Sequence, residues 1–240
     1  MAASKSTARV VWITGAAGGL GRGLVDAFAA QGWAIAAAYH QTTFEPPTDH
    51  VWPVSLDVTV KSQVQSVCDR ILARWGRIDL LINNAGLTAD RWAGQMSEPD
   101  WDRVLSVNLK GAFLCAQSVL PAMLRQREGQ IINIASFSGR VGAVGQSNYA
   151  AAKAGLLGLT ESLARETGPG NIRFNAVLPG ILATRMTSKL APDQLARLIS
   201  DNVLGRTNTV AEVSRFVCFL ATLENVSGQL FQLDSRIARW

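Results

Sequence analysis

Short apolar runs alternate with longer amphipathic segments along this chain, and this alternation constrains its fold more than any other feature. The predicted strands are Val10–Thr14, Trp33–Tyr39, Val51–Leu56, Ile78–Asn83, Gln130–Ala135, Ile172–Leu178 and Leu230–Asp234. Most of them lack polar and apolar alternation, which is typical of strands covered on both faces. The predicted helices between them are Gly21–Gln31, Lys61–Trp75, Asp100–Arg127, Asn148–Thr167 and Val210–Ala221. This order predicts a doubly wound α/β fold, with a seven-stranded parallel sheet and helices on both faces.

We expect one domain over residues 1–240, because no Pro-, Gly- or Ser-rich linker divides the chain. Residues 185–205 fall outside the strand and helix alternation and contain a short helical pattern at about Pro192–Asn202. Its apolar side chains suit a substrate flap and suit an ordinary surface helix equally well. The flap is therefore one of two interpretations of this segment.

Composition excludes several classes of protein. With 48% hydrophobic and 17% charged residues, the chain is too apolar to be disordered. The net charge of +5 permits an acidic partner, but Lys and Arg are dispersed, so we expect no nucleic-acid binding. Three distant cysteines and two histidines indicate neither a disulfide framework nor a metal site. Without a signal peptide or an apolar run long enough to span a membrane, we expect a cytoplasmic location.

A glycine cluster links the first predicted strand to the first predicted helix. Its sequence is TGAAGGLG, from Thr14 to Gly21, with glycines at 15, 18, 19 and 21. Glycines at such a turn let a pyrophosphate approach the backbone, where the helix N-terminus presents free N–H groups. Taken alone, such a glycine cluster is as typical of a plain turn as of a nucleotide site. Its position in an alternating α/β chain favours a dinucleotide site.

The end of the second strand bears on which nicotinamide cofactor fits. A carboxylate there would bind the ribose hydroxyls of NAD(H) and repel the 2′-phosphate of NADP(H). The sequence has Tyr39 and His40, with no carboxylate before Glu45. We therefore favour NADP(H), with NAD(H) as the alternative.

Tyr149 and Lys153 lie four residues apart across three alanines, in a segment that favours helix. This spacing places both side chains on one face, where an ammonium would lower the pKa of a phenol. Such a tyrosine can exchange a proton with a carbonyl or alcohol oxygen. Taken alone, this pair is more often surface decoration. Ser136, however, follows a predicted parallel strand. We therefore expect it at the carboxyl edge of the sheet, where ligands bind in such folds.

Together these motifs resemble the short-chain dehydrogenase/reductase family over essentially the whole chain. The matching motifs are the glycine turn, Asp57, Asn83–Gly86, Asn108, Ser136, Tyr149 with Lys153, and Pro179-Gly180 with Thr184. The resemblance implies a Rossmann fold and a hydride transfer between nicotinamide C4 and a carbonyl carbon. It implies that Tyr149 donates the proton, Ser136 orients the oxygen, Lys153 binds the ribose and Asn108 holds a relay water.

The resemblance also assigns cofactor contacts and a tetramer. The implied cofactor-binding residues are Gly15, Gly18, Gly19, Leu20, Gly21, Tyr39, His40, Asp57, Val58, Asn84, Ala85, Gly86, Tyr149, Lys153, Pro179, Gly180, Leu182 and Thr184. Candidate substrate-pocket residues are Trp92, Met96, Phe137, Val141, Val144, Leu182 and Met186, although side chains of this kind are more often core. Family members usually form homotetramers through the two long helices.

Within the family, the chain is most similar to 3-oxoacyl-[acyl carrier protein] reductases, notably over Gly145–Gly155. This similarity implies a 3-oxoacyl thioester substrate, with Arg127 meeting an acidic carrier protein, although Arg127 also suits a simple helix C-terminal cation. The chain departs from the pattern at Gly170, where those enzymes carry a second arginine, and at Ser235-Arg236, where they carry Gly-Gly. These departures leave a specialised ketoreductase or an acyl-CoA enzyme open. The alternatives are an NAD(H)-dependent alcohol or sugar dehydrogenase and a non-catalytic nucleotide sensor, although sensors usually lack the tyrosine or the lysine.

Overall fold

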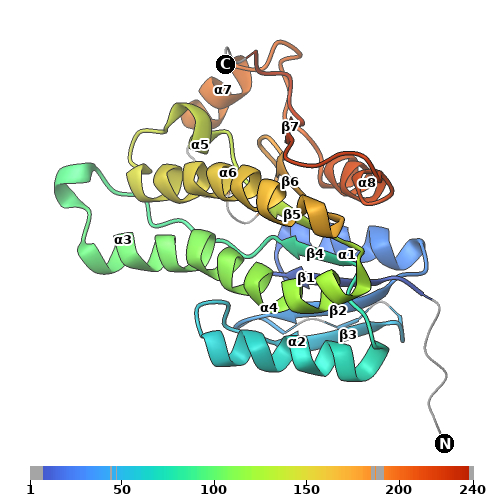
Figure 1. The fold of residues 1–240 in the computed structure, drawn as a ribbon. Helices are drawn as coiled ribbons and strands as arrows, with labels where there is room; N and C mark the ends of the chain where they lie inside the picture. Colours follow the sequence, from blue (N-terminus) through green and yellow to red (C-terminus); the bar gives the residue numbers. More distant parts are fainter. Residues whose placement is uncertain (1–7, 44, 47, 185–186, 188–191, 238–240) are drawn as a thin grey trace, which may run out of the picture.

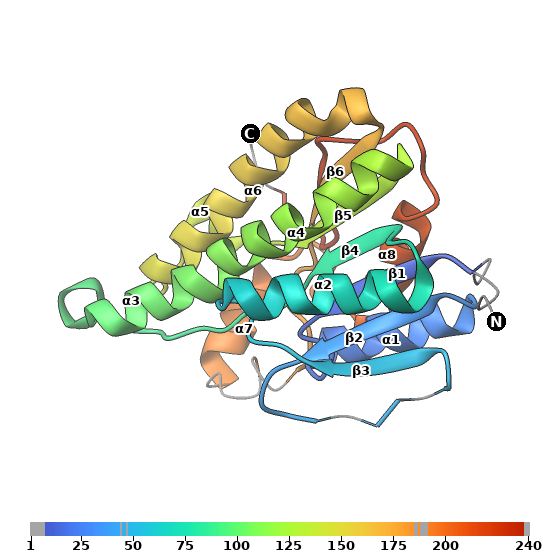
Figure 2. The same ribbon diagram turned by 60° about the horizontal axis from the view of Figure 1, so that its bottom comes forward.

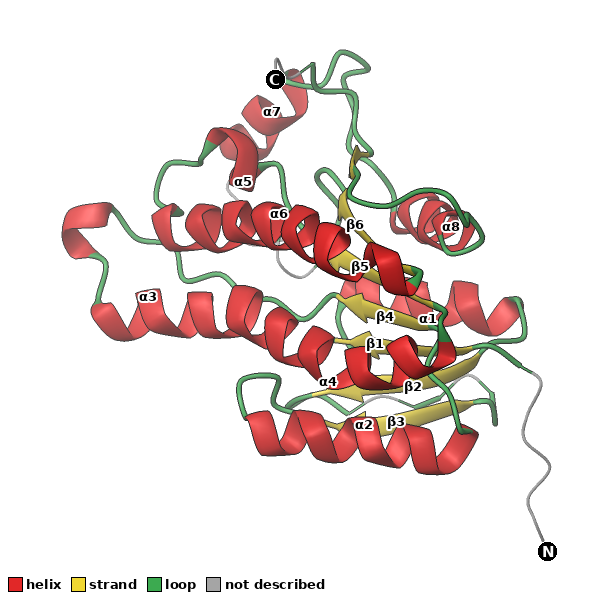
Figure 3. Ribbon diagram, in the orientation of Figure 1, coloured by secondary structure: helices red, strands yellow, loops and turns green. Residues whose placement is uncertain are grey.

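A computed structural model describes residues 8–43, 45–46, 48–184, 187 and 192–237 (Figure 1). The described residues form a seven-stranded parallel sheet, as predicted, and its strand order is β3-β2-β1-β4-β5-β6-β7. The strands are β1 (Val10–Thr14), β2 (Ala34–Tyr39), β3 (Val51–Ser55), β4 (Leu80–Asn83), β5 (Gly129–Ile134), β6 (Ile172–Leu178) and β7 (Leu230–Gln232). Figure 3 shows them as arrows that run in one direction.

Helices cover both faces of this sheet and bury its apolar side chains. On one face lie α2 (Lys61–Trp75), α4 (Gly111–Gln126) and α6 (Ser147–Thr167), and on the other lie α1 (Gly19–Ala30) and α8 (Val210–Leu220). Figure 2 shows α2, α4 and α6 side by side. Because both faces are covered, β1 is buried at every position, which explains its unbroken apolar sequence.

The predicted helix over Asp100–Arg127 is instead a composite. It consists of α3 (Glu98–Leu105), a π-helical turn at Ser106–Lys110 and then α4. This run of 29 residues is long and apolar enough to cross a membrane, but 56% of its most apolar window is buried inside the fold. It is therefore a core helix that packs on the sheet and on α6.

Two shorter helices complete the fold near the carboxyl edge of the sheet. The sequence pattern does not indicate α5 (Ser138–Val141), whereas α7 (Pro192–Ser200) agrees with the helical pattern expected near Pro192–Asn202. Most of the expected flap between residue 185 and α7 lies outside the described residues. After α7, the backbone N–H groups of Val203 and Leu204 donate to Ser235, so this segment contacts the chain that follows β7.

Candidate active site

Because all strands are parallel, the segments after β1, β2, β4, β5 and β6 gather at one edge of the sheet. Ligands bind at this carboxyl edge in open α/β sheets, between loops that leave in opposite directions. The order β3-β2-β1-β4-β5-β6-β7 places the first reversal of chain direction between β1 and β4. The glycine turn after β1 and the Asn83–Gly86 segment after β4 flank that point.

The glycine turn has a conformation that other residues could not adopt. Gly15 has φ of +65° and lies so close to the chain after β4 that a Cβ would come within 2.9 Å of Ala85 Cα. A Cβ on Gly21 would lie 2.1 Å from the carbonyl oxygen of Gly15. Gly18 and Gly19 are exposed, whereas Leu20 is buried and anchors α1 in the core. The start of α1 therefore presents backbone N–H groups beside an exposed turn.

Thr14 joins this turn to the neighbouring loop. Its Oγ1 accepts hydrogen bonds from the backbone N–H groups of Asn84 and Ala85, both at 3.0 Å. The Asn84 side chain donates back to the carbonyls of Thr14 and Gly15 at 3.0 and 3.1 Å. The Asn84 side chain is thus committed to holding two loops together.

The expected adenosine side is built from the ends of β2 and β3. His40 Nε2 lies 3.7 Å from Asp57 Oδ2. Although burial acts to raise it, hydrogen bonds from Thr59 and the nearby His40 hold the pKa of Asp57 below its usual value. Tyr39 is half-buried, and Val58 is buried against Gly111 at the start of α4.

Tyr149 and Lys153 lie on the same face of α6, as the spacing predicts. Lys153 Nζ is 5.6 Å from the centroid of the Tyr149 ring and donates a 2.7 Å hydrogen bond to the carbonyl of Ile134 in β5. Ser136, two residues after Ile134, lies close enough to the Tyr149 side chain to lower the pKa of the phenol. The three side chains therefore form one cluster at the carboxyl edge.

The electrostatics of this cluster differ from the sequence expectation. Burial raises the pKa of Tyr149 to about 12, an effect that the nearby Ser136 side chain reduces and the charge of Asp90 reinforces. Burial also lowers the pKa of Lys153 to about 8. The prediction that the ammonium lowers the pKa of the phenol below its usual value is therefore wrong. Desolvation is the largest cause of both shifts, and Lys153 is not among the causes that shift the pKa of Tyr149.

Asn108 lies in the π-helical turn, where the ordinary helical hydrogen bonds are interrupted. Its Nδ2 donates to the carbonyls of Leu87 and Val104, both at 2.9 Å. Its Oδ1 is buried and has no hydrogen-bond partner among the described residues. A Cβ on Gly86 would lie 2.7 Å from that oxygen and 3.8 Å from Lys153 Nζ. Asn108 and Lys153 are thus neighbours beneath Gly86.

The turn after β6 closes the other side of the glycine turn. Gly180 has φ of +77°, and the side chain of Thr184 would lie 2.8 Å from a Cβ on Gly19. The carbonyl of Pro179 accepts a 3.0 Å hydrogen bond from Asn208 Nδ2. Leu182 is buried in the core beside α1 and α8, so its side chain is structural rather than pocket-lining.

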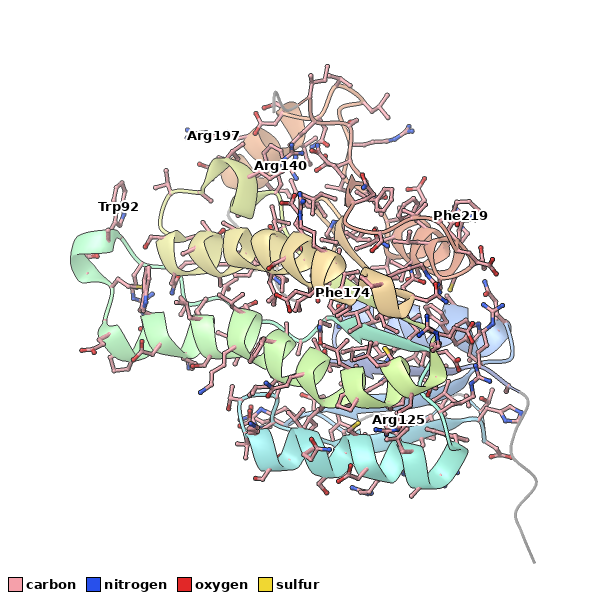
Figure 4. The ribbon with its side chains drawn as sticks, in the orientation of Figure 1. Trp92, Arg125, Arg140, Phe174, Arg197 and Phe219 are labelled. Carbon is pink, nitrogen blue, oxygen red and sulfur yellow. The ribbon has the colours of Figure 1, made fainter. Side chains whose placement is uncertain are left out.

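The candidate substrate residues fall into different environments. Trp92 is 69% exposed and points away from the body of the molecule (Figure 4), and Val144 is 83% exposed. Met96 and Phe137 are half-buried, and Val141 is exposed. Met186 lies outside the described residues.

Arg127 lies at the opposite edge of the sheet from this cluster. It has a left-handed φ of 52° at the end of α4, just before β5, whereas Ser136 follows the far end of that strand. Its carbonyl accepts a 2.8 Å hydrogen bond from Asn171 Nδ2, so the departure at Gly170 lies next to it. Arg127 therefore lies far from the cluster of Ser136, Tyr149 and Lys153 in its own chain.

Sequence reasoning missed the residues that fix the start of α6. Asn148 is fully buried; its Nδ2 donates to the carbonyl of Ala89 at 3.0 Å and contacts Met96 Sδ at 3.2 Å. Gln146 Nε2 donates to Asp90 Oδ2 at 2.9 Å. These contacts hold the loop after β4 beside Tyr149. An asparagine next to a tyrosine carries no sequence signal for this role.

The described residues fit a nicotinamide dinucleotide. The glycine turn leaves no room for side chains yet exposes Gly18 and Gly19 at the N-terminus of α1, where a pyrophosphate is favoured. The orphaned Asn108 Oδ1 and the buried Lys153 ammonium offer polar partners deeper in the same edge. No group of three His, Cys, Asp or Glu side chains that could hold a metal ion occurs among the described residues.

Comparisons with known proteins agree with this geometry. The family model for short chain dehydrogenases matches residues 9–195. A 3-oxoacyl-[acyl-carrier-protein] reductase of Thermotoga maritima is 40% identical over 236 residues, which is 94% of this chain and 96% of the relative. The enzymes of the same name from Escherichia coli and Staphylococcus aureus are 37% and 34% identical, over 90% and 92% of this chain and 91% and 95% of their own length.

Proposed function

We propose, from the premise that this chain belongs to the short-chain dehydrogenase family, that it reduces a 3-oxoacyl thioester to the 3-hydroxyacyl thioester with NADP(H). The observation that carries this proposal is the cluster of Ser136, Tyr149 and Lys153 beside the glycine turn. The names of the similar proteins supply the substrate class. The thioester would be carried on acyl carrier protein or on coenzyme A.

Tyr149 is suited to act as the proton donor. Because burial raises its pKa to about 12, the phenol holds its proton at neutral pH. A protonated phenol can donate to a carbonyl oxygen as negative charge develops there. Ser136, whose side chain lies beside the same phenol, would orient that oxygen. The cofactor, when bound, supplies the hydride.

Lys153 and Asn108, which lie close to each other near Gly86, would support this proton transfer. The Lys153 ammonium would bind the ribose hydroxyls of the cofactor and place positive charge beside the phenol. The Asn108 Oδ1, which lacks a protein partner among the described residues, would hold a water that resupplies the proton. Pro179, Gly180 and Thr184 would bind the carboxamide end.

The choice of NADP(H) rests on the end of β2. Tyr39 and His40 occupy this position, with no carboxylate to repel a 2′-phosphate there, and the His40 side chain is 58% exposed. Asp57 lies beside His40, just after the end of β3, and would meet the adenine ring. The test is the ratio of kcat/KM for NADPH over NADH. We expect a ratio well above one in the wild type, which falls in His40→Ala.

The carrier would dock at Arg127, at the edge of the sheet opposite to the cluster in the same chain. The net charge of +5 favours an acidic carrier, and such docking weakens as salt rises. Arg127→Gln should raise KM for an acyl carrier protein substrate and leave KM for a coenzyme A substrate unchanged. Arg125→Gln is the matched control, because Arg125 is an exposed arginine near the end of the same helix, α4.

We also propose that the chain forms a homotetramer through its long helices and that it is located in the cytoplasm. A groove between the π-helical turn and α6 exposes Phe113 and is lined by Leu109, Gly155 and Leu159. A second copy of the chain would cover these apolar side chains. Sedimentation should give a tetramer, and a monomer would contradict this part of the proposal.

The deciding experiment follows oxidation of NADPH and NADH with acetoacetyl-CoA and then with an acetoacetyl carrier protein. We expect turnover of at least one thioester with NADPH. If no thioester reacts while a secondary alcohol or sugar is oxidised with NAD, the chain is an alcohol or sugar dehydrogenase. If no substrate reacts although the nucleotide binds, it is a nucleotide sensor.

A further inference from the structure

The segment after β7 carries a buried charge pair, Asp234 with Arg236, and Arg236 is one of the two positions where the family resemblance leads us to expect Gly-Gly. Arg236 Nε donates to Asp234 Oδ2 at 2.7 Å, and Nη2 of the same guanidinium donates to the same carboxylate. Their side chains are only 9% and 3% exposed. Gln232 Nε2 adds a 2.7 Å hydrogen bond to Asp234 Oδ1. A buried pair of this kind persists only where hydrogen bonds satisfy both charges, and breaking it is costly.

The Arg236 guanidinium lies over the side chain that follows Ser136. Its Cζ is 3.9 Å from the centroid of the Phe137 ring, which is the geometry of a cation–π contact. Gln232 Oε1 also accepts a 3.2 Å hydrogen bond from Nη1 of Arg140 in α5. Figure 4 shows Arg140 beside α5, toward the C-terminal part of the chain. The C-terminal segment thus holds the turn from Ser136 to Arg140 at two points.

This turn determines where the Ser136 hydroxyl lies. Ser136 Oγ accepts a 3.2 Å hydrogen bond from the backbone N–H of Ser138, and the Ser136 carbonyl accepts one of 3.0 Å from Gly139. Gly139 lies flat on α6, where a Cβ would come within 2.7 Å of the Lys153 and Ala154 backbone. The turn is therefore held between α6 on one side and Arg236 on another.

The same C-terminal segment also contacts the turn after β6. A Cβ on Gly180 would lie 2.7 Å from the Cβ of Asp234. Asn208 Nδ2 donates to the carbonyls of Pro179 and Leu233, at 3.0 and 2.6 Å. The Asp234–Arg236 pair consequently connects the turn expected to hold the cofactor with the turn that carries Ser136.

We propose that Arg236 is a positioning residue, which fixes the Ser136–Phe137 turn relative to the Pro179–Gly180 turn and so aligns Ser136 with the substrate carbonyl. Its charge is paired with Asp234 and its side chain is nearly inaccessible, so it is not a site for an anionic substrate. This inference rests on the proposed function only for its effect on turnover.

The test compares Arg236→Met and Arg236→Lys with the wild type. Methionine removes the charge and the guanidinium, whereas lysine retains a cation over Phe137 but loses the two-point contact with Asp234. Arg77→Met is the matched control, because Arg77 also binds an aspartate two residues away in the chain, Asp79, at the opposite edge of the sheet. When Arg77 is replaced, Asp79 still accepts a hydrogen bond from the Val10 N–H. When Arg236 is replaced, Asp234 likewise still accepts one from Gln232 Nε2.

We expect Arg236→Met to lower kcat about 10- to 100-fold, because a misplacement of about 1 Å can cost 100-fold in rate. Arg236→Lys should fall between this variant and the wild type, and KM for the cofactor should stay within about twofold in both. In a Phe137→Leu background the Arg236→Met change should cost much less, because both act through the same contact. Arg77→Met should lower thermal stability without changing kcat.

Hydrogen exchange supplies a readout that needs no turnover. The amides of Gly139, Arg140 and Val141 donate within the turn, to Ser136 and Phe137. Arg236→Met should exchange these amides about tenfold faster than the wild type, and Arg77→Met should not. Unchanged exchange in Arg236→Met, or a kcat within twofold of the wild type, would overturn the inference. If the wild type reduces no thioester, the proposed function fails while the exchange result still decides this one.

Discussion

Replacing Lys153 by methionine is expected to stabilise the fold while it ends turnover. Lys153 is 4% exposed, and burial lowers its pKa from 10.5 to about 8. At about 1.4 kcal/mol for each tenfold change in the proton affinity, keeping the ammonium charged at pH 7 costs the folded state about 3 kcal/mol. Loss of the hydrogen bond to Ile134 offsets about 1 kcal/mol of this gain. The net gain of about 2 kcal/mol corresponds to a rise in Tm of about 4–8 °C for a chain of this length.

The effect should depend on pH with a definite sign. Because the pKa of Lys153 is lower in the folded state, the unfolded chain binds more protons between pH 8 and 10.5, and wild-type stability rises across this window. The difference in Tm between Lys153→Met and the wild type should therefore be largest below pH 8 and shrink toward pH 10.5.

Thermal unfolding without cofactor, at pH 7 and pH 10, measures this difference directly. Lys61→Met is the control, because Lys61 is exposed at the start of α2 and its replacement should change Tm little at either pH. A Tm of Lys153→Met below that of the wild type at pH 7, or a difference that does not vary with pH, would refute the reasoning.

Two further substitutions test the cofactor turn and the π-helical turn. Gly21→Ala should abolish NADPH binding and lower Tm, because the new Cβ would lie 2.1 Å from the Gly15 carbonyl oxygen. Gly168→Ala is the control, because its Cβ would meet nothing within 4 Å and should change neither property. The fluorescence of bound NADPH and thermal unfolding measure the two effects, and intact NADPH binding in Gly21→Ala would contradict the account. Asn108→Ala removes the donor to the carbonyls of Leu87 and Val104, so it should lower the free energy of unfolding by about 1–3 kcal/mol. The same change should lower kcat at least tenfold. A kcat equal to that of the wild type would exclude Asn108 from the proton relay.

The strands and helices were largely predictable because the sheet is buried on both faces. Buried parallel strands have continuous apolar sequences, so β1 and β6 begin and end where the sequence predicts. The π-helical turn at Ser106–Lys110 was not predictable, since it interrupts a helix whose apolar pattern continues on both sides. α5 is too short to show a helical period.

The candidate site was predictable in its members and not in its electrostatics. The spacing of Tyr149 and Lys153 determines that they share a face of α6, and the strand order places Ser136 beside them. The directions of their pKa shifts depend on burial, which spacing does not reveal. The contact of Arg236 with Phe137 joins two distant segments through side chains alone, so no local pattern could indicate it.

Turnover by Tyr149→Phe tests the central claim most directly. This change removes the phenol oxygen that would donate the proton and leaves the ring, Ser136 and Lys153 in place. With a thioester that the wild type reduces, we predict that kcat falls by about a thousandfold or more, while the Kd for NADPH stays within about twofold. A variant that turns over at the wild-type rate would show that another group supplies the proton.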